Sequence, residues 1–313
     1  MPSTAASISR RNALKCLAYG GAGTLFTLVG GVLVPSDLAY GAGTAPARSK
    51  GVPLFVQISD THIGFSKDAN PDVTGTLGRA IELINAMPER PGLVIHTGDI
   101  THLSKSAEFD TAALLLSTLK VLEVHTTPGE HDVADATGSE YFRRYGKASD
   151  NRGYYSFDYQ GVHFVGLINV LNFKPGGLGA LGSEQLAWLD QDLRGRSSST
   201  PIVVFAHMPM WTVYEPWGWG TADADQAMGY LRRFGSVTVL NGHIHQVLQK
   251  TEGNVTFHTG RSTAFPQPEP GKAESPGPIK NVPAEKLRSM LGLAEVRYTE
   301  TKQMLAVVDS TLE

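Results

Sequence analysis

The sequence predicts an α/β fold, and two observations support that class. Short apolar runs alternate with segments whose apolar residues recur at helical spacing, as strands and helices do in an α/β sheet. The chain of 313 residues is 41% hydrophobic and 18% charged, so it can bury the core of a globular domain. The sequence shows no internal repeat and no linker between two cores, which makes one domain the simpler interpretation.

The first half of this domain is predicted to run strand, helix, strand, helix, strand. Each predicted strand is an apolar run, and each predicted helix has apolar residues at the helical repeat. The expected strands span residues 52–59, 92–98 and 122–128, and the expected helices span residues 73–87 and 107–120.

The second half begins with a predicted β-hairpin over residues 154–168, which turns at Gln160 and Gly161. A helix over 183–193 is expected to start at Ser183, because serine is a favourable helix cap. Further strands are expected, with one helix after the first of them. These strands span 201–207, 236–243, 245–250 and 254–260, and the helix spans 222–234.

The C-terminal part of the domain starts with a proline-rich loop. Residues 264–283 hold six prolines, which remove backbone donors and exclude a central strand or a helix. Residues 284–313 are predicted to form a short helix and a closing hairpin, with the hairpin turn near Thr301 and Lys302.

Residues 1–47 are predicted to be a twin-arginine signal peptide with its cleavage region, which leaves residues 48–313 as the domain. Arg10 and Arg11 precede a weakly apolar, glycine-rich run that small residues follow. The alternative is a membrane anchor, but Pro35 and the glycines make this run a short, weak span. We therefore expect the twin-arginine translocase as a partner during export. The product is expected to be periplasmic or secreted, and membrane-anchored if the signal stays uncleaved.

Charge and cysteine usage exclude several functions. The net charge of −3 gives no basic face for duplex nucleic acid. The only cysteine, Cys16, lies in the predicted signal. The exported chain therefore needs no disulfide and has neither a thiolate nucleophile nor a cysteine metal site. The sequence does not predict an oligomeric state.

Residues that bind protons or metals follow five of the predicted strands. In an extended backbone, residues two positions apart face the same side, so the pairs in "SDTH" and "NGHIHQ" can each meet one ion. Open α/β sheets gather their sites at the carboxyl ends of strands, so the five turns are predicted to converge on one cleft. The candidates are Asp60, His62, Asp99, Glu130, His131, His207, His243 and His245.

These residue types predict a metal centre that acts on phosphate esters. Imidazole and carboxylate ligands without sulfur suit Mn, Fe or Zn, and a shared aspartate suits two ions about 3.5–4 Å apart. Two such divalent or trivalent ions clamp and polarise a phosphoryl group and convert a bound water to hydroxide near neutral pH. Hydrolysis of a small phosphate ester by attack of that metal-bound hydroxide is the predicted reaction.

The ordered motifs D-x-H, G-D, G-x-H-D, H and G-H-x-H, from Asp60 to His245, resemble the calcineurin-like metallophosphoesterase family. The resemblance implies a four-layer αββα sandwich, in which helices flank two mixed β-sheets. It also implies phosphodiesterase, monoesterase or protein phosphatase activity. The motif forms typical of protein phosphatases are absent, which favours a phosphodiester of a small nucleotide or lipid headgroup as the substrate.

The resemblance also implies roles for the candidates, most of which would be ligands of two ions. The first ion would be held by Asp60, His62 and His245, and the second by Glu130, His207 and His243. Asp99 would bridge the two ions. His131 would lie beside the leaving group, as a donor to the phosphoryl oxygens or as a general acid, so His131 and Asp99 are the catalytic candidates.

Two positions depart from the usual family pattern. Glu130 stands where asparagine is common, so the ligand carboxylates number three instead of two, and we hypothesise tighter metal retention with weaker Lewis acidity. His102 stands where many members have an aspartate that supports the catalytic histidine and purple acid phosphatases have a ligating tyrosine. His131 would then need support from Asp132 or His102. Both departures suggest an alternative, a metal-binding protein of the same fold with weak or lost hydrolase activity.

The loop after His207 carries four aromatic residues, which could line the substrate mouth by stacking on a base or a cation. They could equally form a lid that packs on the domain or on a partner, and a structural or interaction protein is therefore a third hypothesis. The four rings are Trp211, Tyr214, Trp217 and Trp219. Histidines that fit no motif are predicted to be structural, namely His96, His125, His163 and His258.

Overall fold

The computed structural model divides the chain into two compact units, Met1–Lys50 and Gly51–Glu313. In the first unit, strand β1 (Phe26–Val29) pairs antiparallel with strand β2 (Val32–Pro35). The predicted arginine pair, Cys16 and the predicted cleavage region lie outside the described residues. The structure describes residues 26–29, 32–35, 53–134, 137–146, 152–171, 176–299 and 304–313.

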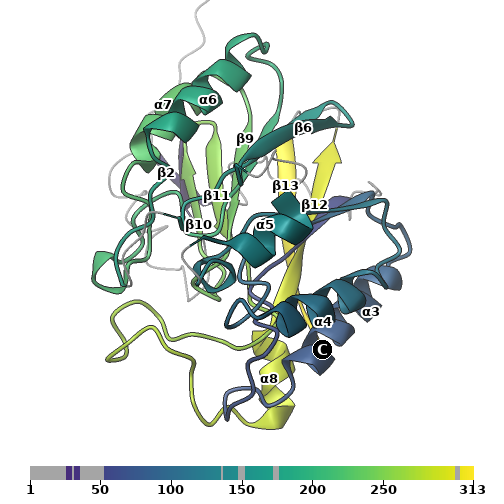
Figure 1. Cartoon of the computed structure of the whole chain (residues 1–313). Coiled ribbons are helices and arrows are strands. Elements are labelled where there is room, and N and C mark those ends of the chain that lie inside the picture. Colours follow the sequence, from purple (N-terminus) through teal and green to yellow (C-terminus); the bar gives the residue numbers. More distant parts are fainter. Residues whose placement is uncertain are drawn as a thin grey trace, which may run out of the picture. The chain divides into compact units, whose positions relative to one another are not determined.

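The first of two mixed sheets in the unit Gly51–Glu313 has five strands. They are β3 (Pro53–Ile58), β4 (Leu93–His96), β5 (Glu123–Thr126), β12 (Gly292–Thr299) and β13 (Met304–Thr311). The strand order is β13-β12-β3-β4-β5, and Figure 1 labels β12 and β13. β3, β4 and β5 run parallel to one another, whereas β12 pairs antiparallel with both β3 and β13. The predicted closing hairpin is therefore confirmed, although its turn lies outside the described residues.

The second mixed sheet has six strands. They are β6 (Tyr155–Tyr159), β7 (Val162–Gly166), β8 (Ile202–Phe205), β9 (Val237–Asn241), β10 (Gln249–Glu252) and β11 (Val255–Thr259). The strand order is β10-β11-β9-β8-β7-β6, and the four central strands run parallel. The two edge strands are antiparallel to their neighbours.

Helices cover the outer face of each sheet. The main ones are α3 (Val73–Asn85), α4 (Ser106–Leu116), α6 (Ser183–Arg194) and α7 (Ala224–Leu231), and shorter ones are α5 (Ser139–Tyr145) and α8 (Ala284–Met290). In Figure 1, α3 and α4 lie on one side of the domain and α6 and α7 on the other. One apolar cluster joins α3 and α4 to the five-stranded sheet, and another joins α6 and α7 to the six-stranded sheet. A third cluster lies between the sheets, where Phe55 meets Phe164 edge to face at 5.3 Å. The predicted αββα fold class is confirmed.

Alternation along the central strands explains how both faces of a sheet are buried. In β8, Ile202 and Val204 join the core under α6 and α7, whereas Val203 and Phe205 join the core between the sheets. Burial of each such side chain contributes about 1.5–3 kcal/mol. A strand that is buried on both faces appears in the sequence as a continuous apolar run, and this is the pattern that predicted β8.

Two local predictions are refined by the structure. The hairpin turn is confirmed at Gln160 and Gly161, since both residues have positive φ (48° and 79°), as a two-residue turn requires. Helix α6 begins at Ser183 as predicted, but Ser183 is not its cap. The cap position is Gly182, whose main-chain N–H donates to the carboxylate of Asp223 at 2.9 Å. The Asp223 carboxylate thus fixes the chain just before the helix, and among the described residues no side chain caps its first turn.

The segment after β9 differs most from its prediction. A strand was expected over residues 245–250, but β10 starts only at Gln249. The residues before it belong to a turn, where the Gln246 side chain donates to the carbonyl oxygens of Gln267 and Pro268 at 3.2 and 2.6 Å. The proline-rich segment 264–283 forms no helix or strand, as predicted. Among the described helices, none has the length and apolar character that a membrane crossing needs.

Candidate metal centre

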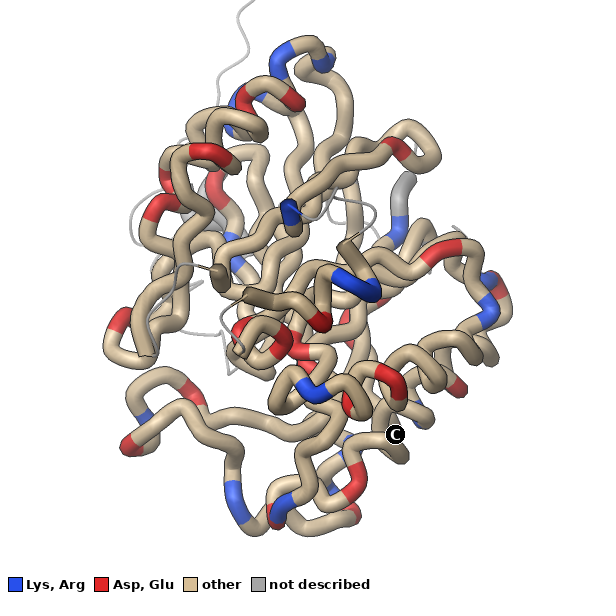
Figure 2. Tube along the Cα trace, viewed as in Figure 1, with Lys and Arg blue, Asp and Glu red and all other residues tan. Residues whose placement is uncertain are grey.

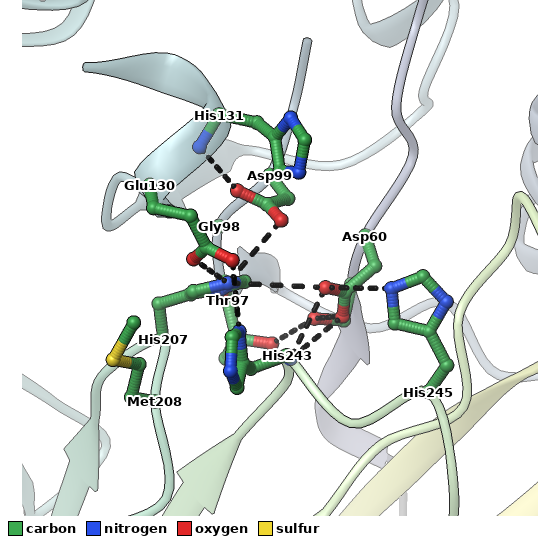
Figure 3. Close-up of polar contacts among 12 residues, drawn as sticks. Asp60, Thr97, Gly98, Asp99, Glu130, His131, His207, Met208, His243 and His245 are labelled. Atoms are coloured by element: carbon green, nitrogen blue, oxygen red, sulfur yellow. Dashed lines mark hydrogen bonds and ion pairs between the residues drawn. The ribbon is translucent and has the colours of Figure 1, made fainter. Parts of the chain in front are cut away.

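The eight side chains that the sequence singled out as candidates come together at one edge of the two sheets. Figure 3 labels all of them except His62. Each lies in a turn that directly follows the carboxyl end of a strand. The turn after β3 carries Asp60 and His62, and the turn after β4 carries Asp99. Glu130 and His131 lie in a short 3-10 helix (Glu130–Asp132) after β5. His207 follows β8, and His243 and His245 follow β9.

The local geometry of these turns differs from the extended backbone that the sequence argument assumed. Asp60, His62, Asp99, His243 and His245 all have left-handed backbones, with φ between 40° and 70°. Elsewhere in the described residues, only three non-glycine residues share this conformation. Residues two apart do meet one another, but through tight turns. Left-handed backbone is tolerated best by Asp, Asn and His among side-chain-bearing residues, and it clusters at functional sites.

Main-chain hydrogen bonds hold the turns against each other. The N–H of Asp60 donates to Gly98 O at 3.0 Å, and the N–H of His62 donates to Asp99 O at 2.9 Å. Gly98 has φ 96°, and a Cβ atom on it would lie 2.5 Å from Nδ1 of His207. A Cβ on Gly129 would lie 2.0 Å from Oδ1 of Asp99. Both glycines are therefore required by the close approach of the ligand side chains.

The first donor group consists of Asp60, His62 and His245. Oδ1 of Asp60 lies 3.3 Å from Nε2 of His245, and Nε2 of His245 lies 3.2 Å from Nε2 of His62. All three side chains are almost fully buried. One carboxylate and two imidazoles at these distances could share a single cation.

The second donor group consists of Glu130, His207 and His243. The two carboxylate oxygens of Glu130 lie 2.9 Å from Nε2 of His207 and 3.0 Å from Nδ1 of His243. Oε2 of Glu130 and both of these nitrogens are buried, and none makes a hydrogen bond with another described residue. Buried polar atoms that face one another without a hydrogen bond fit a site for a cation.

Asp99 lies between the two groups. Its Oδ2 is 3.5 Å from Nε2 of His62 in the first group and 3.4 Å from Nε2 of His207 in the second. Its other oxygen, Oδ1, accepts a hydrogen bond of 3.0 Å from the main-chain N–H of His131. One oxygen of Asp99 is thus placed where it can contact ions in both groups.

Main-chain carbonyl groups orient the rings of His207 and His245. Nδ1 of His207 donates to Thr97 O at 2.7 Å, and Nδ1 of His245 donates to Phe265 O at 2.6 Å. Nε2 of each ring is then the nitrogen available to an ion. The sequence predicted neither Thr97 nor Phe265, because any residue can supply a carbonyl group and no side-chain pattern marks it.

His131 is held in the same way, which answers the question raised by residue 102. Nδ1 of His131 donates to the main-chain oxygen of His102 at 2.7 Å. The Asp132 carboxylate instead accepts main-chain hydrogen bonds from Ile100, Thr101 and Gly129 at 2.8–3.0 Å, so it shapes the turn and does not orient the ring. Burial, together with the charge of Asp99, raises the pKa of Asp132 to about 7.

Electrostatics hold two carboxylates of the centre in their charged form. Burial would raise the pKa of Asp60, but the imidazoles of His245 and His207 hold it at about 2. Burial acts in the same direction on Glu130, where the charges of His243 and His207 hold the pKa well below its usual range. On the face that Figure 2 shows, acidic positions gather near the middle and Lys and Arg lie mainly on outer helices and loops. Charged carboxylates at these positions favour a bound cation.

The aromatic loop after His207 has two kinds of ring. Trp219 is fully buried, and Trp211 packs against Phe257 in the core under α6 and α7. Tyr214 and Trp217 are half-buried and contact each other at 5.1 Å. Within the described residues, the ring contacts of Trp211, Tyr214, Trp217 and Trp219 are to one another and to Phe257, and none is to a donor group. Trp211 is half-buried as well but packs on that core, which leaves Tyr214 and Trp217 as the half-buried rings suited to a ligand.

The histidines predicted to be structural lie outside both donor groups. His163 is buried between Asp158 and Asp192, at 2.9 and 2.7 Å. His258 is buried and lies 2.9 Å from Asp309, which links β11 of one sheet to β13 of the other. His96 is buried beside Thr61, and His125 stacks on Phe157.

Two sheets between layers of helices, with two adjoining donor groups that share one aspartate, define an α/β protein with a centre suited to two metal ions. The model of the calcineurin-like phosphoesterase family matches residues 53–247, which include all eight candidates. The chain therefore belongs to the calcineurin-like phosphoesterase family, a family of hydrolases.

Comparisons with individual proteins agree with this assignment. The chain is 30% identical over 161 residues to a probable glycerophosphodiester phosphodiesterase (GpdQ) of Arcobacter nitrofigilis. This match covers 50% of this chain and 57% of that protein. It is 28% identical over 218 residues to a probable cyclic nucleotide phosphodiesterase of a Synechococcus species, covering 62% and 75%. The matched regions span only 38–57% of three curated relatives.

Among solved structures, a dimetal phosphatase from Danio rerio is similar in fold. It superimposes with a TM-score of 0.60 at 17% sequence identity, and the match covers 83% of this chain and 99% of the other. At this identity the similarity supports the fold alone.

Proposed function

We propose that this protein is a binuclear-metal phosphodiesterase, which hydrolyses a phosphodiester of a small nucleotide or lipid headgroup. One observation carries the proposal. Seven carboxylate and imidazole side chains from five strand ends form two adjoining donor groups, and Asp99 lies within 3.5 Å of a nitrogen in each. Centres for two ions that share a carboxylate suit the hydrolysis of phosphate esters.

Each donor group would hold one ion, with Asp99 in contact with both. Imidazole and carboxylate donors without sulfur suit Mn, Fe or Zn, and the donor set does not distinguish among them. When bound, such ions supply Lewis acidity toward the phosphoryl group and lower the pKa of bound water. The chain itself contributes buried ring nitrogens that are already oriented. The carbonyl groups of Thr97 and Phe265 accept hydrogen bonds from His207 and His245 and thereby fix these two rings.

His131 is the proposed contact to the substrate on the side of the leaving group. Its Nδ1 is occupied by the carbonyl group of His102, so Nε2 is the nitrogen that can face a phosphoryl or leaving-group oxygen. Its main chain is fixed as well, because its N–H donates to Asp99 at 3.0 Å. The main chain of His131 is therefore tied to the same aspartate that lies between the donor groups.

The names of three relatives specify a phosphodiesterase and support a diester, whereas the names of two others specify a serine/threonine-protein phosphatase, which acts on monoesters. The half-buried rings of Tyr214 and Trp217 would be the substrate contacts that remain available from the aromatic loop.

A chromogenic bis-aryl phosphodiester and the matching aryl monoester, assayed side by side, test the proposal. The purified protein would be stripped of metal and reloaded separately with Mn, Fe or Zn before each assay. We expect two ions per chain and faster hydrolysis of the diester with at least one of the metals. Two bound ions without hydrolysis of either ester would instead support the alternative, a metal-binding protein of the same fold with weak or lost activity. Glu130 favours this alternative, because a third carboxylate among the ligands would weaken the Lewis acidity of the ions.

We further propose that the protein is exported by the twin-arginine route and acts in the periplasm or outside the cell. The arginine pair and the weakly apolar run that follows it support this proposal. Replacement of Arg10 and Arg11 by lysine should retain the full-length protein in the cytoplasm, while the unaltered chain appears in the periplasm or medium. Equal distribution of the two proteins would contradict the proposal.

A further inference from the structure

We propose that His102 is a positioning residue for His62. In this arrangement Nδ1–H of His62 donates to Nδ1 of His102, and Nε2 of His62 is thereby kept free for the first donor group. The inference rests on the proposed metal centre, and it assigns to residue 102 a role that differs from support of His131.

His62 is an exception among the rings that offer Nε2 to an ion or a substrate. His207, His245 and His131 each donate from Nδ1 to a main-chain carbonyl oxygen at 2.6–2.7 Å. His62 has no such carbonyl partner. Within the described residues, the only polar atom in hydrogen-bond contact with its Nδ1 is Nδ1 of His102, at 3.5 Å. The opposite nitrogen of His62, Nε2, lies 3.2 Å from His245 and 3.5 Å from Asp99.

The tautomers follow from these contacts. An imidazole that offers Nε2 to a cation carries its proton on Nδ1, and this proton needs an acceptor. A neutral His102 with its proton on Nε2 offers Nδ1 as that acceptor. The same pair of nitrogens therefore fixes the tautomers of both rings.

His102 is itself held firmly enough to act as a support. Its main-chain N–H donates to Ile63 O at 2.9 Å, and its main-chain oxygen accepts from His131. Its ring stacks on His131 with centroids 4.9 Å apart and an interplanar angle of 17°. The ring of Phe65 is perpendicular to the ring of His102, with centroids 5.2 Å apart. These contacts restrict the orientation of the ring without occupying its Nδ1.

The three rings of His62, His102 and His131 are close enough to suggest a third ion instead. Ligation by Nδ1 of His62, with Nε2 already directed to the first group, would require His62 to lose both ring protons. A hydrogen bond between neutral rings requires no such loss. At 3.5 Å this bond is long, so its effect is expected on ion affinity and tautomer, and far less on the stability of the fold.

A matched pair of substitutions in the full-length chain tests the inference. In His102→Asn, the side-chain oxygen lies about where Nδ1 was and still accepts a hydrogen bond, whereas His102→Phe keeps the stacked ring and has no acceptor. His125→Phe, which removes a histidine stacked on Phe157 outside the centre, is the control. Ion affinity would be measured by competition with a chelator, using Mn and Zn separately. Long-range proton–nitrogen spectra of the metal-free protein would report the tautomer of His62.

We expect His102→Phe to weaken binding of the first ion by about 10–100-fold, the range known for loss of an outer-sphere partner. His102→Asn and His125→Phe should stay close to the unaltered protein. The spectra should show one His62 tautomer, protonated on Nδ1, in the unaltered and Asn proteins and a mixture in the Phe protein. Equal affinities for the Asn and Phe variants, or an unchanged tautomer in the Phe variant, would overturn the inference. Failure of the unaltered chain to bind two ions would instead overturn the proposed function.

Discussion

The two donor groups have the same composition but different access to solvent. Each offers one carboxylate and two imidazoles. In the first group no side chain is more than 2% exposed, whereas in the second the side chains of Glu130 and His243 are 18% and 11% exposed. The difference suggests a division of labour in which the closed group retains its ion and the open group is where water and substrate enter.

Both groups nevertheless depend on the same packing. All three carboxylates, Asp60, Asp99 and Glu130, follow strands of the five-stranded sheet, and His207, His243 and His245 follow strands of the six-stranded sheet. Neither sheet alone builds a donor group. The apolar cluster between the sheets therefore positions the metal centre as well as stabilising the fold.

Substitution of Asp99 by asparagine should have the largest effect, because it alters the contact that the two groups share. We expect loss of tight binding at both positions and a fall in hydrolysis of more than about 100-fold, beyond what loss of an outer-sphere partner causes. Metal analysis after gel filtration, together with the diester assay, measures both effects. Loss of one ion only would show that Asp99 belongs to a single group.

Glu130→Asn should separate the groups. The variant removes one negative charge from the open group and keeps an oxygen donor, so we expect about 10-fold weaker binding there and unchanged binding in the closed group. Hydrolysis with saturating metal should rise, because an ion held by one carboxylate charge fewer would be a stronger Lewis acid. Unchanged ion content and unchanged rate would remove the idea that Glu130 strengthens retention.

Removal of metal should proceed in two phases. Exposure of Glu130 and His243 gives a chelator direct access to the open group, and the closed group must first open locally. We expect the two ions to leave at rates that differ by about tenfold, a difference of ~1.4 kcal/mol in barrier. Stopped-flow chelation with a coloured chelator resolves the phases. A single phase that releases both ions together would argue against the division of labour.

The cluster of His163, Asp158 and Asp192 lies outside both donor groups. A substitution in this cluster is expected to have the smallest effect and serves as a control. Burial would raise the pKa of Asp192, but hydrogen bonds from His163 and Ser156 hold it below its usual value. A lowered pKa contributes stability that is present above the unfolded value, near 3.9, and is lost as pH falls through the folded value.

We expect Asp192→Asn to lower the free energy of unfolding by about 1–2 kcal/mol at pH 7, with the difference from the unaltered protein shrinking below about pH 4. Urea unfolding across this pH range measures the difference, and ion content should not change. A change in ion content would mean that the effect of the substitution reaches the centre.

Much of the fold and the donor set could be predicted from sequence, and for physical reasons. Strands buried on both faces are continuous apolar runs, and short polar turns after them bear the donors. Asp60 and His62 were predicted to lie close together because an extended backbone was assumed. They do lie close together, but both residues have left-handed backbone. The carbonyl partners Thr97 and Phe265 could not be predicted, because their contribution is independent of side-chain identity.

The left-handed turns have a consequence for design. A D-x-H motif grafted onto a regular strand of another scaffold would place its side chains along different directions from those seen in this chain. The transferable unit is instead a pair of interlocked turns, residues 59–63 with 97–101, joined by main-chain hydrogen bonds at 2.9–3.0 Å. An engineer who copies both backbones and the glycine between Thr97 and Asp99 would carry over the geometry, whereas one who copies the letters would not.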